Sequence, residues 1–337
     1  MKKNLLYIGN KLSEHGNTAT SIETLGFFLE NEGYNLFYAS SKKNKFLRLL
    51  DMIFSTIKNA RKVDYVLIDT YSTQNFWFAL IISQLCRVLN VKYITKLHGG
   101  DLPNRLKRSP FFCDLLFKNA YRITAPSAYL LNAFMAKYPQ HLVYIANTIE
   151  IQNYILETRT FATPKLLWVR SFSTIYNPKM AITVLAELKK DYPGASLCMV
   201  GPDKENLVND CKLFAQKLNV EVRFTGKLAK EEWVELSKDF NIFINTTHFD
   251  NTPISVIEAM ALGIPVVSTN VGGIPFLLQD KQNAMLVDDD DSKAMKLAIE
   301  GLLNDTVLRE NIIRNARITV EDFDWEIVKN KWFDILK

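Results

Sequence analysis

Short apolar segments alternate with longer amphipathic segments along almost the whole chain, and this alternation limits the folds open to it. In the first half the apolar segments fall at residues 5–8, 66–68, 93–97, 123–125 and 142–145. After a polar break at residues 157–164 the pattern restarts, at residues 166–169, 197–200, 222–225, 242–245, 265–268 and 284–287. Strands that alternate with helices in this way form parallel sheets covered by helices. The sequence therefore predicts an α/β fold with two Rossmann-like domains.

The length of the chain fits this division. Its 337 residues are too many for one ordinary core and suit two domains of about 150 residues each. We place the first domain at residues 1–157, the second at residues 158–322, and a C-terminal amphipathic helix at residues 323–337. No apolar run approaches the roughly 20 residues that a membrane-spanning helix needs, and the first residues resemble a strand more than a signal peptide. We expect a cytoplasmic protein.

Neither metal nor redox chemistry is indicated. The four cysteines have no C-x-x-C spacing, which predicts ordinary core thiols. No D-x-D motif ends a strand, and the acidic run at residues 288–291 is so close to a helix start that we expect it to cap that helix. The loop after the first strand lacks a G-x-G-x-x-G fingerprint, which disfavours a nicotinamide enzyme. We predict that the protein needs no cofactor and no metal.

Basic charge gathers in the first half of the chain. Residues 1–160 hold 20 Lys and Arg against 11 Asp and Glu, whereas the remainder holds 21 against 25. Much of the excess lies in residues 40–62, where an apolar stripe is surrounded by basic side chains that include Lys42, Lys43, Lys45 and Arg48. Such a helix suits an anionic membrane surface. The alternative is that the stripe docks on the first sheet while the lysines face solvent. Nucleic acid is disfavoured because no groove-reading motif accompanies the charge.

The densest functional signal lies at residues 249–278, FDNTPISVIEAMALGIPVVSTNVGGIPFLL. Asp250 precedes a predicted helix, and Glu258, eight positions later, falls more than a turn inside it. Between them the amides of Asn251, Thr252 and the first helical turn form a positive backbone end suited to a diphosphate. A glycine that stops the helix, a β-branched strand and a glycine pair follow. Each piece alone is weak, but their order is specific.

Two further polar side chains lie where predicted strands end. His98 opens the sequence HGGD directly after the strand at residues 93–97, and Arg170 ends the strand at residues 166–169. Open α/β folds bind ligands at the carboxyl edge of the sheet. The planar cation of Arg170 is suited to a diphosphate. Asp101 could orient His98 or meet an acceptor hydroxyl.

These motifs resemble those of the family-four retaining glycosyltransferases (glycosyl transferases group 1), which have the GT-B architecture of two facing Rossmann-like domains with a cleft between them. The segment 249–278 is similar to the E-x7-E region of that family, with Asp250 in place of the first glutamate. The resemblance implies that Asp250 contacts the transferred sugar and that Glu258 holds the nucleotide ribose. It also implies that His98 touches the donor sugar and that Arg170 binds the diphosphate.

The resemblance extends to two loops that would contact the donor. Gly16 and Asn17 occupy the place of the family's glycine loop, which approaches the phosphates. The sequence FTGKL is similar to the loop whose backbone reads the edge of the base, and it contributes Gly226, Lys227 and Leu228.

The phosphate site departs from the family pattern at one position. The family usually places a lysine about six residues after the arginine, but Tyr176 stands there. We expect either that Lys179 substitutes from the first turn of the next helix or that Tyr176 donates one hydrogen bond in place of a charge.

Together these features predict a metal-independent glycosyltransferase that moves a hexose-type unit from a UDP- or GDP-sugar to a glycan or lipid-linked glycan in polysaccharide biosynthesis. His98, Asp250 and Arg170 carry catalysis in this hypothesis, and Asp101 lies on the acceptor side. Retention of configuration is implied by the resemblance alone. Two alternatives stay open, a catalytically idle GT-B partner in an assembly and a GT-B sugar-nucleotide epimerase. The protein would act in the cytoplasm, on the inner face of the cell membrane if the basic helix binds lipid.

Overall fold

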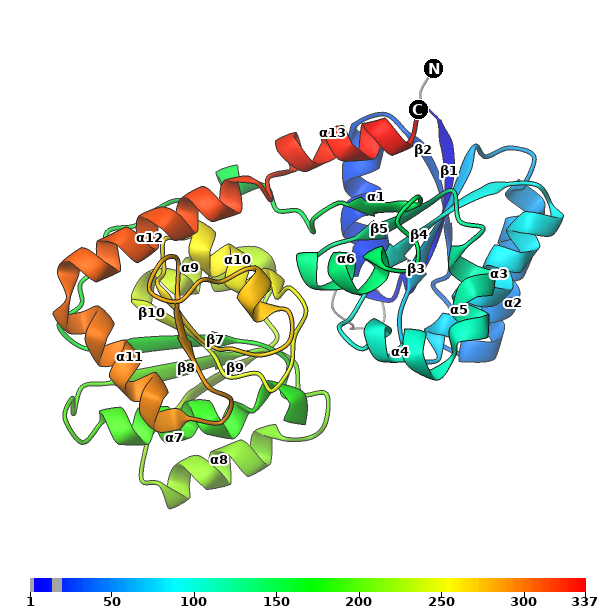
Figure 1. Ribbon diagram of the computed structural model, residues 1–337. Helices are drawn as coiled ribbons and strands as arrows, with labels where there is room; N and C mark the ends of the chain where they lie inside the picture. The colour runs from blue at the N-terminus through cyan, green and yellow to red at the C-terminus, as the bar shows by residue number, and fades with distance from the viewer. Residues whose placement is uncertain (1–2, 14–19) are drawn as a thin grey trace. The chain divides into compact units, whose positions relative to one another are not determined.

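The computed structural model describes residues 3–13 and 20–337, which form two compact units (Figure 1). Unit 1 is Met1–Thr148 together with Trp325–Lys337, and unit 2 is Ile149–Asp324. Gly16 and Asn17, the glycine loop predicted to approach the phosphates, lie outside the described residues.

Unit 1 is built on a six-stranded parallel sheet in the order β2-β1-β3-β4-β5-β6. Its strands are β1 (Asn4–Ile8), β2 (Asn35–Ala39), β3 (Tyr65–Thr70), β4 (Lys92–Leu97), β5 (Arg122–Ala125) and β6 (Leu142–Tyr144). All six residues of β3 are buried, because a central strand of a parallel sheet is covered on both faces. The chain leaves β1 in one direction and returns to β3 on its other side. The switch point of this sheet therefore lies between β1 and β3.

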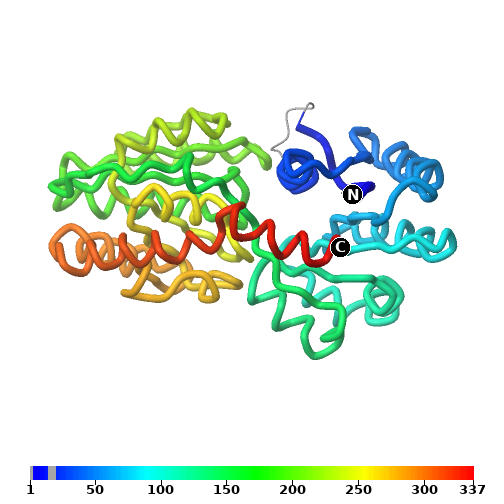
Figure 2. The backbone as a smooth tube through the Cα atoms, turned by 90° about the horizontal axis from the view of Figure 1, so that it is seen from above, coloured from blue at the N-terminus to red at the C-terminus, as the bar shows by residue number. Residues whose placement is uncertain are grey.

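Helices cover both faces of the first sheet (Figure 1). One face carries α2 (Lys45–Asn59), α3 (Asn75–Val88), α5 (Pro110–Phe117) and α6 (Ala128–Met135). The short helix α4 (Leu102–Arg108) comes directly before α5 in the chain. The other face carries α1 (Ser21–Asn31) and α13 (Trp325–Ile335), whose rings Phe28 and Trp325 stack 4.8 Å apart. The C-terminal helix is tied down further by Tyr65, whose hydroxyl donates to the carbonyl of Lys337 at 2.7 Å. In Figure 2 the red C-terminal end of the chain accordingly lies among the blue and cyan segments of unit 1.

Unit 2 contains the second six-stranded parallel sheet, in the order β12-β11-β10-β7-β8-β9. Its strands are β7 (Lys165–Val169), β8 (Ser196–Val200), β9 (Arg223–Gly226), β10 (Ile242–Asn245), β11 (Val266–Thr269) and β12 (Met285–Val287). Helices α7 (Pro178–Leu188), α8 (Val208–Lys217) and α11 (Ser292–Asn304) pack on one face over the core. On the opposite side Figure 1 shows α9 (Lys230–Leu236), α10 (Ile254–Ala261) and α12 (Thr306–Glu321). The switch point here lies between β7 and β10.

The predicted α/β class with two Rossmann-like domains is confirmed, and each of the eleven predicted apolar segments overlaps a strand of these sheets. Strand β2 was missed. It lies at the edge of its sheet, and its burial alternates between exposed and half-buried side chains. A short edge strand of this kind gives no continuous apolar run in the sequence.

The boundary between the units falls at residues 148 and 149, nine residues before the predicted boundary after residue 157. The segment that follows Thr148 already belongs to unit 2. The amide of Ile149 donates to the carbonyl of Phe323 at 3.0 Å, and the hydroxyl of Tyr154 donates to Glu258 at 2.8 Å. The polar break in the sequence reflects an exposed connection inside unit 2 rather than the division itself.

The helix α2 corrects two expectations about the basic segment. Its apolar stripe does not dock on the sheet, because Phe46 and Phe54 are 68% and 64% exposed. Arg48 does not belong to an exposed basic surface, because it is buried and donates to the carbonyls of Lys42 and Lys43 and to the side chain of Asn10. A guanidinium can saturate several acceptors at once, so Arg48 is buried on the inner face beside Met52, which belongs to the apolar core.

Candidate functional site

The switch point of the second sheet brings Arg170 and Asp250 together. Arg170 directly follows β7, and Asp250 lies in the loop after β10. Because β7 and β10 are neighbours whose connections run in opposite directions, the edge at their carboxyl ends is where a sheet of this kind binds its ligands. Residues that are 80 positions apart in the sequence therefore meet at the edge of the sheet.

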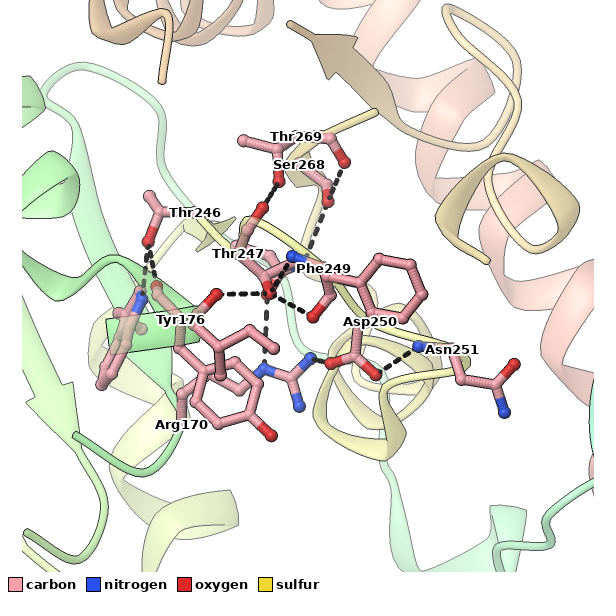
Figure 3. Close-up of polar contacts among 12 residues, drawn as sticks. Arg170, Tyr176, Thr246, Thr247, Phe249, Asp250, Asn251, Ser268 and Thr269 are labelled. Carbon is pink, nitrogen blue, oxygen red and sulfur yellow. Dashed lines mark hydrogen bonds and ion pairs between the residues drawn. The ribbon is translucent and has the colours of Figure 1, made fainter. Parts of the chain in front are cut away.

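Arg170 is held from three sides (Figure 3). Its Nη2 group forms an ion pair with the Oδ2 atom of Asp250, and both side chains are largely buried, at 12% and 16% exposure. The Nε group donates to Asn245 at 3.3 Å, and the ring of Tyr176 lies 4.7 Å from the guanidinium carbon. Tyr176 thus supports the arginine through a cation–π contact. The guanidinium carries further N–H donors besides these two, as a diphosphate site requires.

Buried threonines fix the loop between β10 and α10. Thr246 accepts from the indole of Trp168 at 3.0 Å and donates to the carbonyl of Tyr176 at 2.9 Å. Thr247 donates to the carbonyl of Phe249 at 2.8 Å, and its own carbonyl accepts from Thr269 at 2.5 Å. Both threonines are fully buried. These bonds satisfy the polar groups of a buried loop and so determine where Asp250 lies.

The glycine pair after β11 makes room for this loop. The amide of Gly273 donates to the carbonyl of Asp250 at 2.7 Å. A Cβ atom at Gly273 would lie 2.1 Å from the carbonyl oxygen of Asn251, and one at Gly272 would lie 2.4 Å from that of Asp250. Only backbone fits here, so the glycines are required by close approach.

Glu258 lies within α10 and forms a second charged cluster. It is 4% exposed, and its Oε1 atom accepts from the hydroxyl of Tyr154 at 2.8 Å and from the ammonium of Lys230 at 2.8 Å. Burial, and then the carboxylate of Glu258, raise the pKa of Tyr154, which keeps the phenol protonated as a donor. Lys230 is half exposed and therefore remains solvated. The cluster orients a carboxylate on the same short helix whose N-terminal end follows Asp250.

The other residues predicted to bind the donor lie at separate places in unit 2. Lys179 does not join Arg170, since its ammonium lies over the ring of Phe214 in α8. Gly226 ends β9 in a left-handed conformation with φ +73°, which favours glycine, and Lys227 and Leu228 follow it. Of the two substitutes considered for the missing phosphate lysine, Tyr176 is therefore the one in contact with Arg170.

In unit 1, His98 pairs with a residue that the sequence reasoning missed. Its Nε2 atom lies 2.7 Å from the Oδ1 atom of Asp69, which ends β3, and its ring stacks on that of Tyr71 at 4.8 Å. The hydroxyl of Tyr7 donates to the same oxygen at 3.1 Å. The side chain of Asp69 is fully buried, and its second oxygen has no hydrogen-bond partner within residues 3–13 and 20–337. A cavity of about 10 Å³ beside Asp69 is large enough for one water molecule.

Burial dominates the electrostatics of this cluster. It lowers the pKa of His98, and the nearby carboxylate of Asp69 acts in the opposite direction without overcoming it. Burial likewise lowers the pKa of Lys96 to about 8, again opposed by Asp69, and the Lys96 ammonium donates to Asn147 at 3.2 Å. His98 is therefore neutral near pH 7. When a carboxylate holds one nitrogen of a neutral imidazole, the other ring nitrogen can form a hydrogen bond with a substrate.

Asp101 does not orient His98. It lies at the start of α4, exposed to solvent, and accepts from Asn104 at 2.7 Å. The acid that orients His98 is Asp69. In the sequence it directly follows the apolar segment 66–68, and a polar residue after such a segment is the same signal that singled out His98. Tyr154 and Lys230 gave no comparable signal, because each contacts Glu258 from a distant part of the chain.

Comparison with known proteins adds the family. Residues 161–319, just under half of the chain, match the family model described as glycosyl transferases group 1. Unit 2 is a glycosyl transferases group 1 domain. The resemblance inferred from the sequence is thereby confirmed for this unit. The matched range includes Arg170, Asp250, Glu258 and Lys230.

A relative and two solved structures extend the comparison. The chain is 29% identical over 156 residues to the sulfoquinovosyl transferase SQD2 of Arabidopsis thaliana, a match that covers 45% of this chain and only 29% of that protein. The structure is similar to sucrose-phosphate synthase from Thermosynechococcus elongatus, with a TM-score of 0.80 and 16% identity, covering 99% of this chain and 98% of the other. It is also similar to Anabaena HepE, solved in complex with UDP-glucose, with a TM-score of 0.77, 17% identity and 99% coverage of both chains. These structures share the GT-B fold.

The described part of the chain also bears on the expectations about membrane spans, metal sites, cysteines and the acidic run. No helix within residues 3–13 and 20–337 is long and apolar enough to cross a membrane. The same residues contain no group of three or more His, Cys, Asp or Glu side chains that could hold a metal ion, and metal independence stays a prediction. All four cysteines are buried as free thiols, as predicted, and Asp291 caps α11 by accepting from the amide of Ala294 at 2.8 Å.

The glycine pair provides a test of the loop geometry. Gly273 has φ −88°, which alanine tolerates, so Gly273→Ala acts through the contact with Asn251 alone. We expect the free energy of unfolding of unit 2 to fall by about 1–3 kcal/mol, the usual effect of overpacking. Hydrogen exchange of the β10 and β11 amides would measure it. Gly301→Ala in α11 is the control, because a Cβ atom there meets nothing within 4 Å and should leave stability unchanged or raise it. Equal effects of the two substitutions would contradict the steric argument.

The His98 cluster provides a second test. The carboxylate of Asp69 favours the charged forms of both neighbouring bases, so Asp69→Asn should lower the pKa of His98 further and bring that of Lys96 below about 8. Titration followed by NMR on the His98 ring and the Lys96 side chain would show the direction. Asp101→Asn is the matched control and should move neither value. An unchanged or raised pKa of His98 in Asp69→Asn would refute the electrostatic role of Asp69.

Proposed function

We propose that the protein is a retaining glycosyltransferase that moves a sugar from a nucleoside-diphosphate sugar to a glycan acceptor. The observation that carries the proposal is the ion pair of Arg170 and Asp250 at the switch point of the second sheet. Asp250 precedes the buried Glu258 of α10 by eight residues. The group 1 family match over residues 161–319 supports it. So does the shared fold with HepE, a protein solved in complex with UDP-glucose.

The donor's leaving group defines the electrostatic task of the site. When a nucleoside diphosphate leaves an anomeric carbon, negative charge grows on the β-phosphate and positive charge on the sugar ring. Arg170 is proposed to stabilise the phosphate, together with the amides of Thr252 and the first turn of α10, because the amide of Asn251, also expected at the diphosphate, already donates to Asp250. Tyr176 holds the guanidinium in place through its ring, which replaces part of what the usual lysine would provide. No metal ion is required in this proposal.

Asp250 and Glu258 are proposed to have separate roles. Asp250 lies in the loop before α10, bonded to Arg170 and to the amide of Asn251 at 2.7 Å, where it would accept hydrogen bonds from the transferred sugar. Glu258 lies within the helix and would accept from the ribose hydroxyls. Tyr154 and Lys230 hold its carboxylate on one oxygen, so they fix the direction of the other. Gly226, Lys227 and Leu228 would approach the base.

His98 is proposed to contact the donor sugar from unit 1, with Asp69 fixing its tautomer and Asp101 on the acceptor side. Asp69 binds the Nε2 edge of the ring, so Nδ1 is the nitrogen left for substrate. The acceptor is proposed to be a glycan or a lipid-linked glycan of polysaccharide biosynthesis. We place the reaction in the cytoplasm.

The ribose role of Glu258 can be tested by calorimetric titration with UDP and with GDP. Wild-type protein should bind one of the two, and Glu258→Ala should weaken binding at least about tenfold, or about 1.4 kcal/mol, because the ribose acceptor is lost. Glu258→Gln, which preserves volume, guards against a folding defect, and the exposed Glu310→Ala is the control. Failure of the wild-type protein to bind either nucleotide would refute the donor site and favour an idle GT-B assembly partner.

The role of Asp250 is tested by comparing turnover with affinity. Release of the nucleotide from its sugar donor without acceptor should slow at least about tenfold in Asp250→Asn, whereas nucleotide affinity should change by less than about threefold, because the base and ribose contacts remain. Product analysis would also reveal interconversion of the free donor, the signature of an epimerase. Equal losses in turnover and affinity would contradict the division of roles between Asp250 and Glu258.

A further inference from the structure

Helix α2 presents a stripe of apolar side chains to solvent, while Met52 on its other face belongs to the core. Phe46, Leu50, Phe54 and Ile57 follow one another at helical spacing, and with Leu47 they are between 46% and 68% exposed. A helix at the surface of an α/β unit ordinarily turns such a stripe toward its sheet. The reversed orientation therefore exposes an apolar surface that folding does not bury.

The opposite face of α2 explains why the helix cannot simply rotate. Its buried residues include Arg48, Thr56 and Asn59 beside Met52. The guanidinium of Arg48 donates to two backbone carbonyls and to Asn10, and Thr56 donates to the carbonyl of Met52 at 2.7 Å. The bonds of Arg48 reach outside the helix, to Asn10 and to the segment before α2, and turning the stripe inward would break them, whereas the bond of Thr56 lies within the helix. The orientation is thus built into the packing of unit 1.

Exposed apolar side chains also lie on α3 and α5, which cover the same face of the sheet as α2 (Figure 1). Trp77 and Ile81 on α3 are 38% and 41% exposed, and Phe111 and Phe112 on α5 are 67% and 39% exposed. The ring of Phe112 contacts both Trp77, at 5.0 Å, and Phe111, at 5.4 Å. We call the exposed apolar residues of these three helices the outer apolar face. It consists of Phe46, Leu47, Leu50, Phe54, Ile57, Trp77, Ile81, Val88, Phe111 and Phe112.

Exposed basic residues accompany the helices that carry the outer apolar face. Residues 42–62 contain seven Lys and Arg and a single acid, Asp51. Apart from Arg48 these basic side chains are exposed, as are Arg87 at the end of α3 and Lys107 and Arg108 at the end of α4. Helix α3 itself contains no acidic residue. The face therefore combines exposed aromatic and aliphatic side chains with a positive border.

We propose that the outer apolar face is a docking surface for an anionic lipid bilayer. Aromatic and leucine side chains enter the boundary between headgroups and acyl chains, while lysines and arginines reach anionic headgroups with their charged ends. A protein partner would need an acidic rim around an apolar patch, whereas every anionic bilayer has negatively charged headgroups above an apolar interior. The lysines at 42, 43 and 45 take part, and Arg48 acts by holding the helix in this orientation. The surface is independent of the proposed donor site in unit 2.

The proposal is tested by co-sedimentation of the full chain with vesicles. Wild-type protein should bind vesicles containing about a third phosphatidylglycerol at least about tenfold more strongly than vesicles of phosphatidylcholine alone, and binding should fall in high salt. An apolar variant and a charge variant should each lose about tenfold. They are Phe46→Ser with Leu50→Ser and Phe54→Ser, and Lys42→Gln with Lys43→Gln and Lys45→Gln.

Matched controls lie in unit 2, on side chains of comparable exposure. The apolar control is Leu213→Ser with Leu297→Ser and Val307→Ser, and the charge control is Lys212→Gln with Lys217→Gln and Lys293→Gln. Both should bind vesicles within about twofold of wild type. Nucleotide titration of every variant separates this proposal from the proposed function, because loss of vesicle binding should leave nucleotide affinity unchanged.

Three results would overturn the proposal. One is absence of wild-type binding to the anionic vesicles, and another is unchanged binding by both the apolar and the charge variant. The third combines two measurements: the wild type does not bind vesicles, and it forms a dimer in sedimentation velocity whereas the apolar variant is monomeric. That result would assign the face to contact between two copies of the chain. Because all substituted side chains are exposed, none of these outcomes can be attributed to misfolding of the core.

Discussion

In a parallel sheet every strand ends at the same edge, and both units of this protein place their charged clusters there. The constraint is geometric, because each crossover helix returns the chain to the opposite edge before the next strand begins. Arg170 after β7 and Asp250 after β10 meet in this way, as do Asp69 near the end of β3 and His98 directly after β4. The sheets thus supply rigid platforms, and the loops at their carboxyl ends supply the chemistry.

Each of these carboxylates is buried beside a base, and the pairing sets its properties. Arg170 neutralises Asp250 and, supported by Tyr176, keeps a fixed direction. Lys230 and Tyr154 hold Glu258, and the pKa of Tyr154 rises because burial and the carboxylate both disfavour a phenolate. At His98 burial outweighs the attraction of Asp69 and leaves the ring neutral near pH 7. These pairs contribute to the stability of the fold, because removing one partner leaves a buried charge unsatisfied.

Helix α2 of unit 1 has the reverse arrangement of polar and apolar side chains. On α2 the polar side chains of Arg48, Thr56 and Asn59 share the inner face with Met52, while Phe46 and Phe54 lie on the outer face, against the usual preference for apolar burial. The hydrogen bonds of Arg48 hold the helix in this orientation, which leaves the aromatic side chains exposed. The proposed donor site belongs to unit 2 and the outer apolar face to unit 1, so substitutions can test the two proposals separately.

The sequence by itself determined the α/β class, the segment around Asp250 and Glu258, and the strand-end positions of His98 and Arg170, because strand periodicity and helix signals are local properties of a chain. It did not reveal β2, whose half-exposed edge position gives no apolar run, nor the boundary at residue 148, which depends on contacts with residues near 323. Only the tertiary structure decided the partners, since Tyr154 lies 104 positions from Glu258 and Asp69 lies 29 from His98. It also decided which way α2 faces. Periodicity shows that a helix has two faces, but which one turns inward depends on the hydrogen bonds that the rest of the fold offers.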